Sequence, residues 1–189
     1  RKSIRTSERF RAMAASSDVK ELSLKQAFKK LLDQKETAIN WIIVSASSGE
    51  ATLVKYGAGF SSLMGSFSND AMQWGLLGVL GVDDSSVKSI RSKLVQIDWF
   101  GGGVREGDKG KMLNKQRPVI QKFAGAIACN IPASSKGDIT ARKVAYKLFH
   151  AQGAHKPTYY DFGDEKVQTS GLSTEDDNAD DEDEDEDFD

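Results

Sequence analysis

The sequence has a single cysteine and no long hydrophobic run. Because Cys129 is the only thiol among the 189 residues, no disulfide can form within the chain, and a lone cysteine suits a reducing compartment. No apolar stretch approaches the roughly 18 residues that a membrane-spanning helix needs. We therefore expect a cytoplasmic, monomeric protein without a transmembrane segment.

Histidine is also scarce, and its placement argues against a metal site. His150 and His155 are the only two, and their spacing, with Cys129 as the one thiol, fits no known ligand pattern. Neither histidine has a partnered nucleophile nearby in the sequence. The acidic run at residues 180–189 lacks the spaced ligands and the glycine of an EF-hand loop. We expect neither a metal nor another cofactor.

A glycine-rich stretch resembles a phosphate-binding loop only superficially. Residues 107–111 read Gly-Asp-Lys-Gly-Lys, but Met112 follows where a P-loop requires Ser or Thr. Arg105 stands where the first glycine of that loop is required. The sequence thus contains no recognisable catalytic motif, and we expect a protein that is not an enzyme.

Charge is distributed very unevenly along the chain. Residues 171–189 hold 12 of the 28 acidic residues and no Lys or Arg, so residues 1–170 carry 26 basic against 16 acidic side chains. The net charge of −2 therefore conceals a body of +10 and a tail of −12. A basic body indicates an anionic partner, such as an acidic protein surface, a phosphoinositide membrane or a nucleic acid.

These shifts in composition predict three parts. Residues 1–20 are expected to be a flexible basic leader; ordinary leaders share this composition with organelle transit peptides. Residues 21–163 are expected to form a folded domain. Residues 164–189 are expected to be a disordered acidic tail, because residues 180–189 are almost entirely Asp and Glu and have only Phe188 to bury against the entropy of ordering.

Hydrophobic periodicity predicts an α/β protein of the α+β sandwich type. A five-stranded mixed sheet would be flanked on both faces by about four helices. Helices are expected to begin after Ser23, at Phe60, after Asp108 and after Asp138, and the third is expected to kink or break at Pro118. Strands are expected at residues 39–46, 51–57, 73–82, 93–100 and 126–132. Residues 153–162 are expected to be coil.

The strand at residues 93–100 is the most informative element. Its side chains alternate, with Val95, Ile97 and Trp99 on one face, and a partly apolar second face indicates a strand covered on both sides. Arg91 and Lys93 then lie at its entrance, at the rim of the sheet, where their charges can stay solvated.

The long helix adds further basic residues. Together with the strand entrance it predicts a basic ridge that would attract an acidic protein surface, made of Arg91, Lys93, Lys109, Lys111, Lys115 and Arg117. The alternative is that these side chains only solvate an outer face. Because no aromatic residues alternate with them to stack on bases, nucleic acid is the least favoured partner.

Two segments carry a family resemblance: Arg91-Ser92-Lys93-Leu94-Val95-Gln96-Ile97-Asp98-Trp99 and Val119-Ile120-Gln121-Lys122-Phe123-Ala124. Together with the order of elements, they resemble the ADF-homology family, and within it the coactosin-like subgroup. The resemblance covers about Leu22 to Asp161. It implies a non-enzymatic, cytoskeletal protein that binds filamentous actin. Lys93 would contact the filament, and residues 108–117 would lie against it.

The chain departs from that family at the end of its last helix. The subgroup usually has a lysine there, whereas this sequence has Phe149-His150-Ala151, so His150 is the remaining candidate for that contact. The departure leaves open a second function, a scaffold subunit that keeps the fold without binding actin. Two readings also remain for the acidic tail, which would either occupy the basic ridge and compete with actin or only confer solubility.

Overall fold

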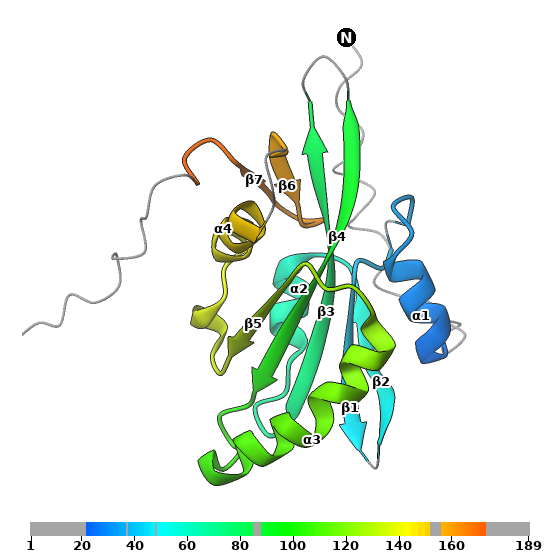
Figure 1. Ribbon diagram of the computed structural model, residues 1–189, viewed down its shortest axis with the longest axis vertical. Coiled ribbons are helices and arrows are strands. Elements are labelled where there is room, and N and C mark those ends of the chain that lie inside the picture. Colours follow the sequence, from blue (N-terminus) through cyan, green and yellow to red (C-terminus); the bar gives the residue numbers. More distant parts are fainter. Residues whose placement is uncertain (1–21, 37, 48, 85–87, 152–155, 173–189) are drawn as a thin grey trace, which may run out of the picture.

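The computed structural model describes residues 22–36, 38–47, 49–84, 88–151 and 156–172. It forms one mixed sheet with helices on both faces, as predicted (Figure 1). The helices are α1 (Leu24–Leu31), α2 (Phe60–Ser66), α3 (Glu106–Ala124) and α4 (Ala141–Ala151). The strands are β1 (Trp41–Ser47), β2 (Glu50–Gly57), β3 (Met72–Asp83), β4 (Ser89–Phe100), β5 (Cys129–Ala133), β6 (Tyr159–Asp161) and β7 (Lys166–Gln168).

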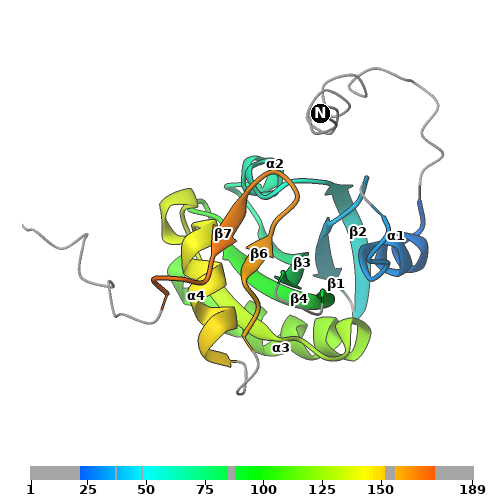
Figure 2. The ribbon, with the colours of Figure 1, turned by 90° about the horizontal axis from the view of Figure 1, so that it is seen from above.

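Two separate apolar cores lie on the two faces of the sheet. One contains buried side chains of α2 and α4, and the other contains those of α1 and α3. Figure 2 shows the two pairs of helices on opposite sides of the strands. The side chains of β4 divide as the sequence predicted, with Val95, Ile97 and Trp99 in the first core and Leu94 in the second. This strand is covered on both faces.

The sheet has seven strands rather than the five expected. Five of them follow the order β2-β1-β3-β4-β5, in which only β4 and β5 are parallel. The two additional strands, β6 and β7, lie in segments expected to be coil and acidic tail. They form because β3 extends past the last residue that β1 pairs with, Leu77, and β6 pairs with the remaining edge at residues 80–82. The ordered domain therefore continues past residue 163 to at least Leu172, which is buried.

Helix α1 begins as the sequence predicts. The Ser23 hydroxyl accepts a hydrogen bond from the Gln26 amide at 3.3 Å, and the Gln26 side chain accepts one from the Ser23 amide at 2.9 Å. This reciprocal capping box satisfies two amides that the first turn of a helix leaves without partners. The sequence also predicted Asp108 as a helix cap, but Asp108 lies inside the first turn of α3, whose N-cap is Arg105.

Asp138 does not cap α4, although the sequence suggested it. It ends a short 3₁₀ helix (Lys136–Asp138), and its carboxylate accepts hydrogen bonds from the Ser135 hydroxyl at 2.6 Å and from the amides of Ser134 and Ser135 at 2.7 Å. Led by the bond from the Ser135 hydroxyl, these lower the pKa of Asp138 to about 2. The first turn of α4 is capped instead by the Thr140 hydroxyl, which accepts from the Lys143 amide.

Helix α3 is continuous through Pro118, so the expected break is absent. Proline removes one hydrogen bond and crowds the preceding turn. The helix is held at this point by tertiary contacts on both sides of the proline: Arg117 forms an ion pair with β4, and Ile120 is fully buried. Of the helices described, none combines the length and hydrophobicity required to cross a membrane.

Candidate functional site

The outer part of the β3–β4 hairpin projects from the body of the molecule (Figure 1). The two strands pair along their whole length, from Met72 with Phe100 to Asp83 with Ser89. Strand β5 begins to pair with β4 only at Val95, so residues 89–93 extend beyond it. The projecting segment carries Ile90, whose side chain is 53% exposed. The projecting part of the hairpin is thus covered less than the rest of β4.

Arg91 and Lys93 lie within this segment, on one face of β4. They alternate with Val95 and so point to the side of the sheet covered by α2 and α4. Arg91 is exposed, whereas Lys93 is half-buried. The strand begins earlier than predicted, at Ser89, so both residues lie inside the strand; they remain at the rim of the sheet because the hairpin projects.

A third basic residue joins them from a distant part of the sequence. Lys156 lines the same small depression as Arg91 and Lys93, together with Asp83 and Pro157. Its ammonium donates a hydrogen bond to the carbonyl oxygen of Phe149 in the last turn of α4, and it lies 4.3 Å from the centre of the Phe149 ring. A cation at this place is favoured by the partial negative charge of the helix C-terminus.

Lys156 was not among the residues that the sequence singled out. It lies seven residues beyond Phe149, outside the helical pattern, so periodicity gives no reason to place it near β4. The only signal is its position immediately before Pro157 and the run of aromatic residues that forms β6. The three cations of the depression, Arg91, Lys93 and Lys156, are called the hairpin cluster below.

His150 makes its contacts elsewhere. Its Nε2 lies 3.2 Å from the carbonyl oxygen of Leu172, and its ring lies 4.2 Å from that of Tyr146. At the other end of α4, Arg142 donates a hydrogen bond to the carbonyl of Gly171, the residue before Leu172. These contacts hold the last described residues of the chain against α4. His150 therefore has a structural role in this contact between α4 and Leu172.

The basic residues of α3 differ from one another in their surroundings. Lys111 and Lys115 are exposed, whereas Lys109 is half-buried and forms an ion pair with Glu106 at 2.7 Å. Arg117 points inward, contrary to the expectation that it lies on the outer face. Its guanidinium is 2.6 Å from the carboxylate of Asp98, a fully buried residue of β4. Arg117 thus anchors the helix to the sheet.

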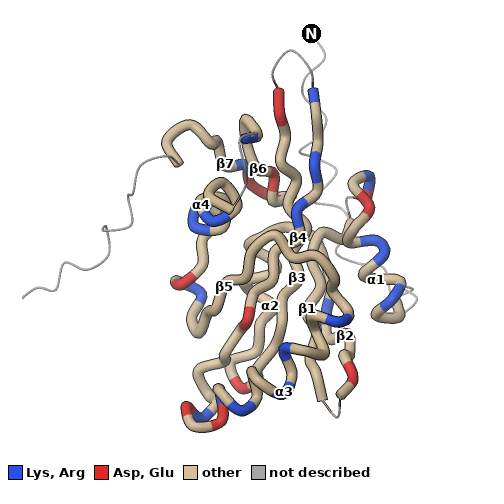
Figure 3. The backbone as a smooth tube through the Cα atoms, in the orientation of Figure 1, with Lys and Arg blue, Asp and Glu red and all other residues tan. Residues whose placement is uncertain are grey.

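The structure also divides the expected ridge in two. Helix α3 packs in the core opposite the one that contains Val95, so its lysines and the hairpin cluster belong to different faces of the sheet. Figure 3 shows basic residues on the projecting hairpin at one end of the molecule and on the first half of α3 towards the other. Lys111 and Lys115 form a second basic group, separate from the hairpin cluster. In the described parts of the chain, no cluster of His, Cys, Asp and Glu is suited to binding a metal.

Comparison with known proteins identifies the fold. The coactosin of Entamoeba histolytica superimposes with a TM-score of 0.56 at 17% sequence identity, covering 68% of this chain and 93% of that one. Human coactosin-like protein gives a TM-score of 0.58 at 17% identity, with 69% and 87% of the two chains covered. Mouse coactosin, described as an actin filament binding protein, gives 0.52 at 18% identity, with 69% and 88% covered.

The sequence itself matches one family model. No curated protein matches the chain. The model for cofilin/tropomyosin-type actin-binding proteins, however, matches residues 16–149, which is well over half of the chain and includes the basic residues of β4 and α3 but not Lys156. The domain shares its fold with the coactosins, and the chain belongs to the cofilin/tropomyosin-type actin-binding protein family.

Proposed function

We propose that this protein binds filamentous actin without catalysing a reaction, and that the hairpin cluster is the centre of its contact. The observation that carries the proposal is the convergence of Arg91, Lys93 and Lys156 on one depression along the projecting part of the hairpin. Actin presents an acidic surface, so three neighbouring cations would speed encounter and fix the orientation of binding. The protein would then be located at the cytoskeleton.

Lys156 lies close to the point at the end of α4 where the chain departs from the family. The lysine expected there is absent, but Lys156 brings an ammonium to the last turn of the same helix from seven residues further along the chain. We infer that it supplies the contact for which His150 was the candidate. Its bond to the Phe149 carbonyl limits the freedom of the side chain, so less entropy is lost when a partner binds.

The second basic group extends the proposed contact. Lys111 and Lys115 are exposed on the first half of α3, and neither has an ion pair among the described residues. They are available to a second region of the filament. Lys109 is expected to contribute less to filament binding because it is ion-paired with Glu106. Arg117 is not part of the proposed contact because it is ion-paired with Asp98.

The acidic tail is proposed to regulate this binding. Residues 173–189 carry twelve carboxylates and no Lys or Arg, and they follow Leu172, which is held on α4 by His150. The tail therefore follows a residue held at the last turn of α4, the same turn that Lys156 contacts. A tethered anion at this place competes with actin for the hairpin cluster at high effective concentration.

Co-sedimentation with actin filaments at low salt tests the proposal. The wild type is expected to pellet with filaments, and the double variant Arg91→Glu/Lys93→Glu to remain largely in the supernatant. Vesicles containing phosphoinositides are the comparison, because the same cations attract phosphate headgroups. Binding to the vesicles but not to filaments would exclude actin as the partner of the hairpin cluster.

A further inference from the structure

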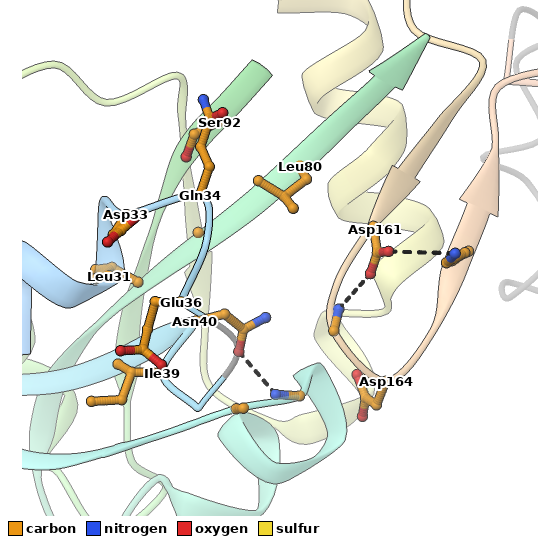
Figure 4. A pocket seen from close by; sticks show the side chains of 15 residues that line it. Leu31, Asp33, Gln34, Glu36, Ile39, Asn40, Leu80, Ser92, Asp161 and Asp164 are labelled. Carbon is orange, nitrogen blue, oxygen red and sulfur yellow. Dashed lines mark hydrogen bonds and ion pairs between the residues drawn. The ribbon is translucent and has the colours of Figure 1, made fainter. Parts of the chain in front are cut away.

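One cavity of the domain is lined by none of the residues of the two basic groups. It has a volume of about 620 Å³ and opens between the loop that follows α1, the start of α2 and the β6–β7 turn, with β3 and β4 as its floor (Figure 4). This size is typical of cavities that bind a small molecule or a few residues of a peptide. Neither the fold comparison nor the proposed actin contact uses it.

The cavity exists because two strands share one edge of β3. Strand β1 pairs with β3 up to Leu77, and β6 pairs with it from Leu80, so a gap remains between them. Asn40 bridges this gap. Its side-chain amide donates to the Phe162 carbonyl at 2.7 Å, and its side-chain oxygen accepts from the Gly59 amide at 2.9 Å. These bonds keep the walls in place, so the cavity is preformed.

Its walls are acidic and its interior is apolar. Figure 4 shows Asp33 and Glu36 on one side and Asp161 and Asp164 on the other. The lining includes a single basic residue, Lys166, which is 3.6 Å from Asp161. Between the walls lie Leu31, Ile39 and Leu80. An apolar floor with carboxylates around it suits a side chain that has an aliphatic stem and a cationic head, above all arginine.

The chain itself contains a segment of this chemistry close by. Residues 1–21 include six Lys and Arg residues against three acids, with arginines at positions 5, 9 and 11. This segment leads directly into α1, and the last residue of α1, Leu31, lines the cavity. The helix is about 12 Å long, whereas 21 extended residues can span ~70 Å, so the segment is long enough to reach back.

We propose that this cavity binds the basic N-terminal segment of the same chain, with an arginine between its two acidic walls. The tether makes the event intramolecular, so even a weak contact is highly populated. The inference does not depend on actin binding. Asp164 contributes charge more than hydrogen bonding, because its oxygens already accept from the amides of Phe60 and Ser61 at the start of α2. Glu36 is already ion-paired with Lys30 at 2.6 Å. Asp33 and Asp161 each accept a hydrogen bond from only one backbone amide of the described residues, those of Lys35 and Gly163, so they are the better choice for testing the site.

Limited trypsin digestion of the full chain tests the proposal. At low salt, cleavage after Arg5, Arg9 and Arg11 is expected to be several-fold faster in Asp33→Asn/Asp161→Asn than in the wild type. The matched control is Glu50→Gln/Asp70→Asn, which removes two exposed carboxylates outside the cavity and is expected to keep the wild-type rate. Thermal unfolding of both variants shows whether they remain folded.

A salt series on the wild type provides a measurement that needs no substitution. Protection is expected to fall as ionic strength rises, because the contact is between charges near the surface. Equal cleavage rates in the wild type and the cavity variant would overturn the proposal. Protection that increases with protein concentration would also overturn it, since the occupant would then come from a second copy of the chain.

Discussion

Arg117 of α3 and Asp98 of β4 form a 2.6 Å ion pair that joins the long helix to the centre of the sheet. The Asp98 side chain is completely buried, and it also accepts hydrogen bonds from Gln96 at 2.6 Å and from Asn130 at 2.9 Å. One carboxylate thus connects β4, α3 and β5. The pair explains why α3 passes through Pro118 without a break, and it holds the Arg117 guanidinium against the sheet while the side chain stays partly exposed.

Arg117→Ala is expected to destabilise the fold by about 2–4 kcal/mol, because it leaves the Asp98 charge buried without its cation. The free energy of unfolding from urea titration measures the effect. Lys115→Ala on the same helix is the control and is expected to change that free energy by less than about 0.5 kcal/mol. Equal stability of the two variants would show that the ion pair does not hold the helix in place.

The charged form of Asp138 is expected to stabilise the fold at neutral pH. Its pKa is lowered from 3.8 to about 2, first by the Ser135 hydroxyl and then by two backbone amides. The folded protein therefore gains stability from the charged form above about pH 4 and loses it as the pH falls towards 2. The difference in urea midpoint between wild type and Asp138→Asn should be constant at neutral pH and narrow below pH 4. A difference that stays unchanged down to pH 2.5 would refute this assignment.

Removal of residues 173–189 is expected to tighten binding to actin filaments at low salt. The reason is that the tail no longer competes for the hairpin cluster, and the gain should disappear as salt screens both contacts. Filament affinity across a salt series measures it. A tail of the same length with Asn and Gln in place of Asp and Glu separates charge from length and should behave like the deletion. Unchanged affinity at low salt would leave the tail only a role in solubility.

Lys156→Glu is expected to weaken filament binding by roughly tenfold, similar to a charge reversal at Lys93. Lys156→Arg should retain most of the affinity, since it keeps the positive charge beside the end of α4. The control is Lys25→Glu, an exposed lysine on α1 outside the depression. If Lys156→Glu binds as well as this control, the contact missing from the end of α4 is not supplied by Lys156.

Local patterns predicted much of this fold because the elements they describe are stabilised locally. The capping box at Ser23, the β1–β2 hairpin and the alternation of β4 all depend on residues close together in the sequence. The three-residue strands β6 and β7 could not be predicted in this way. They form because β3 has an edge that β1 leaves unpaired, and only the assembled sheet reveals that edge.

The same distinction applies to the candidate site. The segment around Lys93 could be singled out because its strand is unusual in itself. The inward position of Arg117 depends on a carboxylate nineteen residues earlier, although Asp98 in a covered strand was a sign that a buried charge required a partner. Lys156 lines the same depression as Arg91 because of how the folded chain packs, and the sequence has no periodic signal for that packing.

Lys93 and its neighbours are proposed to bind filamentous actin. Co-sedimentation of the full chain with filaments at low salt, comparing wild type, Lys93→Glu and the control Lys25→Glu, is the decisive experiment. The wild type and the control are expected to pellet with filaments, and Lys93→Glu is expected to lose most of its binding. A wild type that does not pellet, or a Lys93→Glu variant that pellets as well as the control, would contradict the proposal.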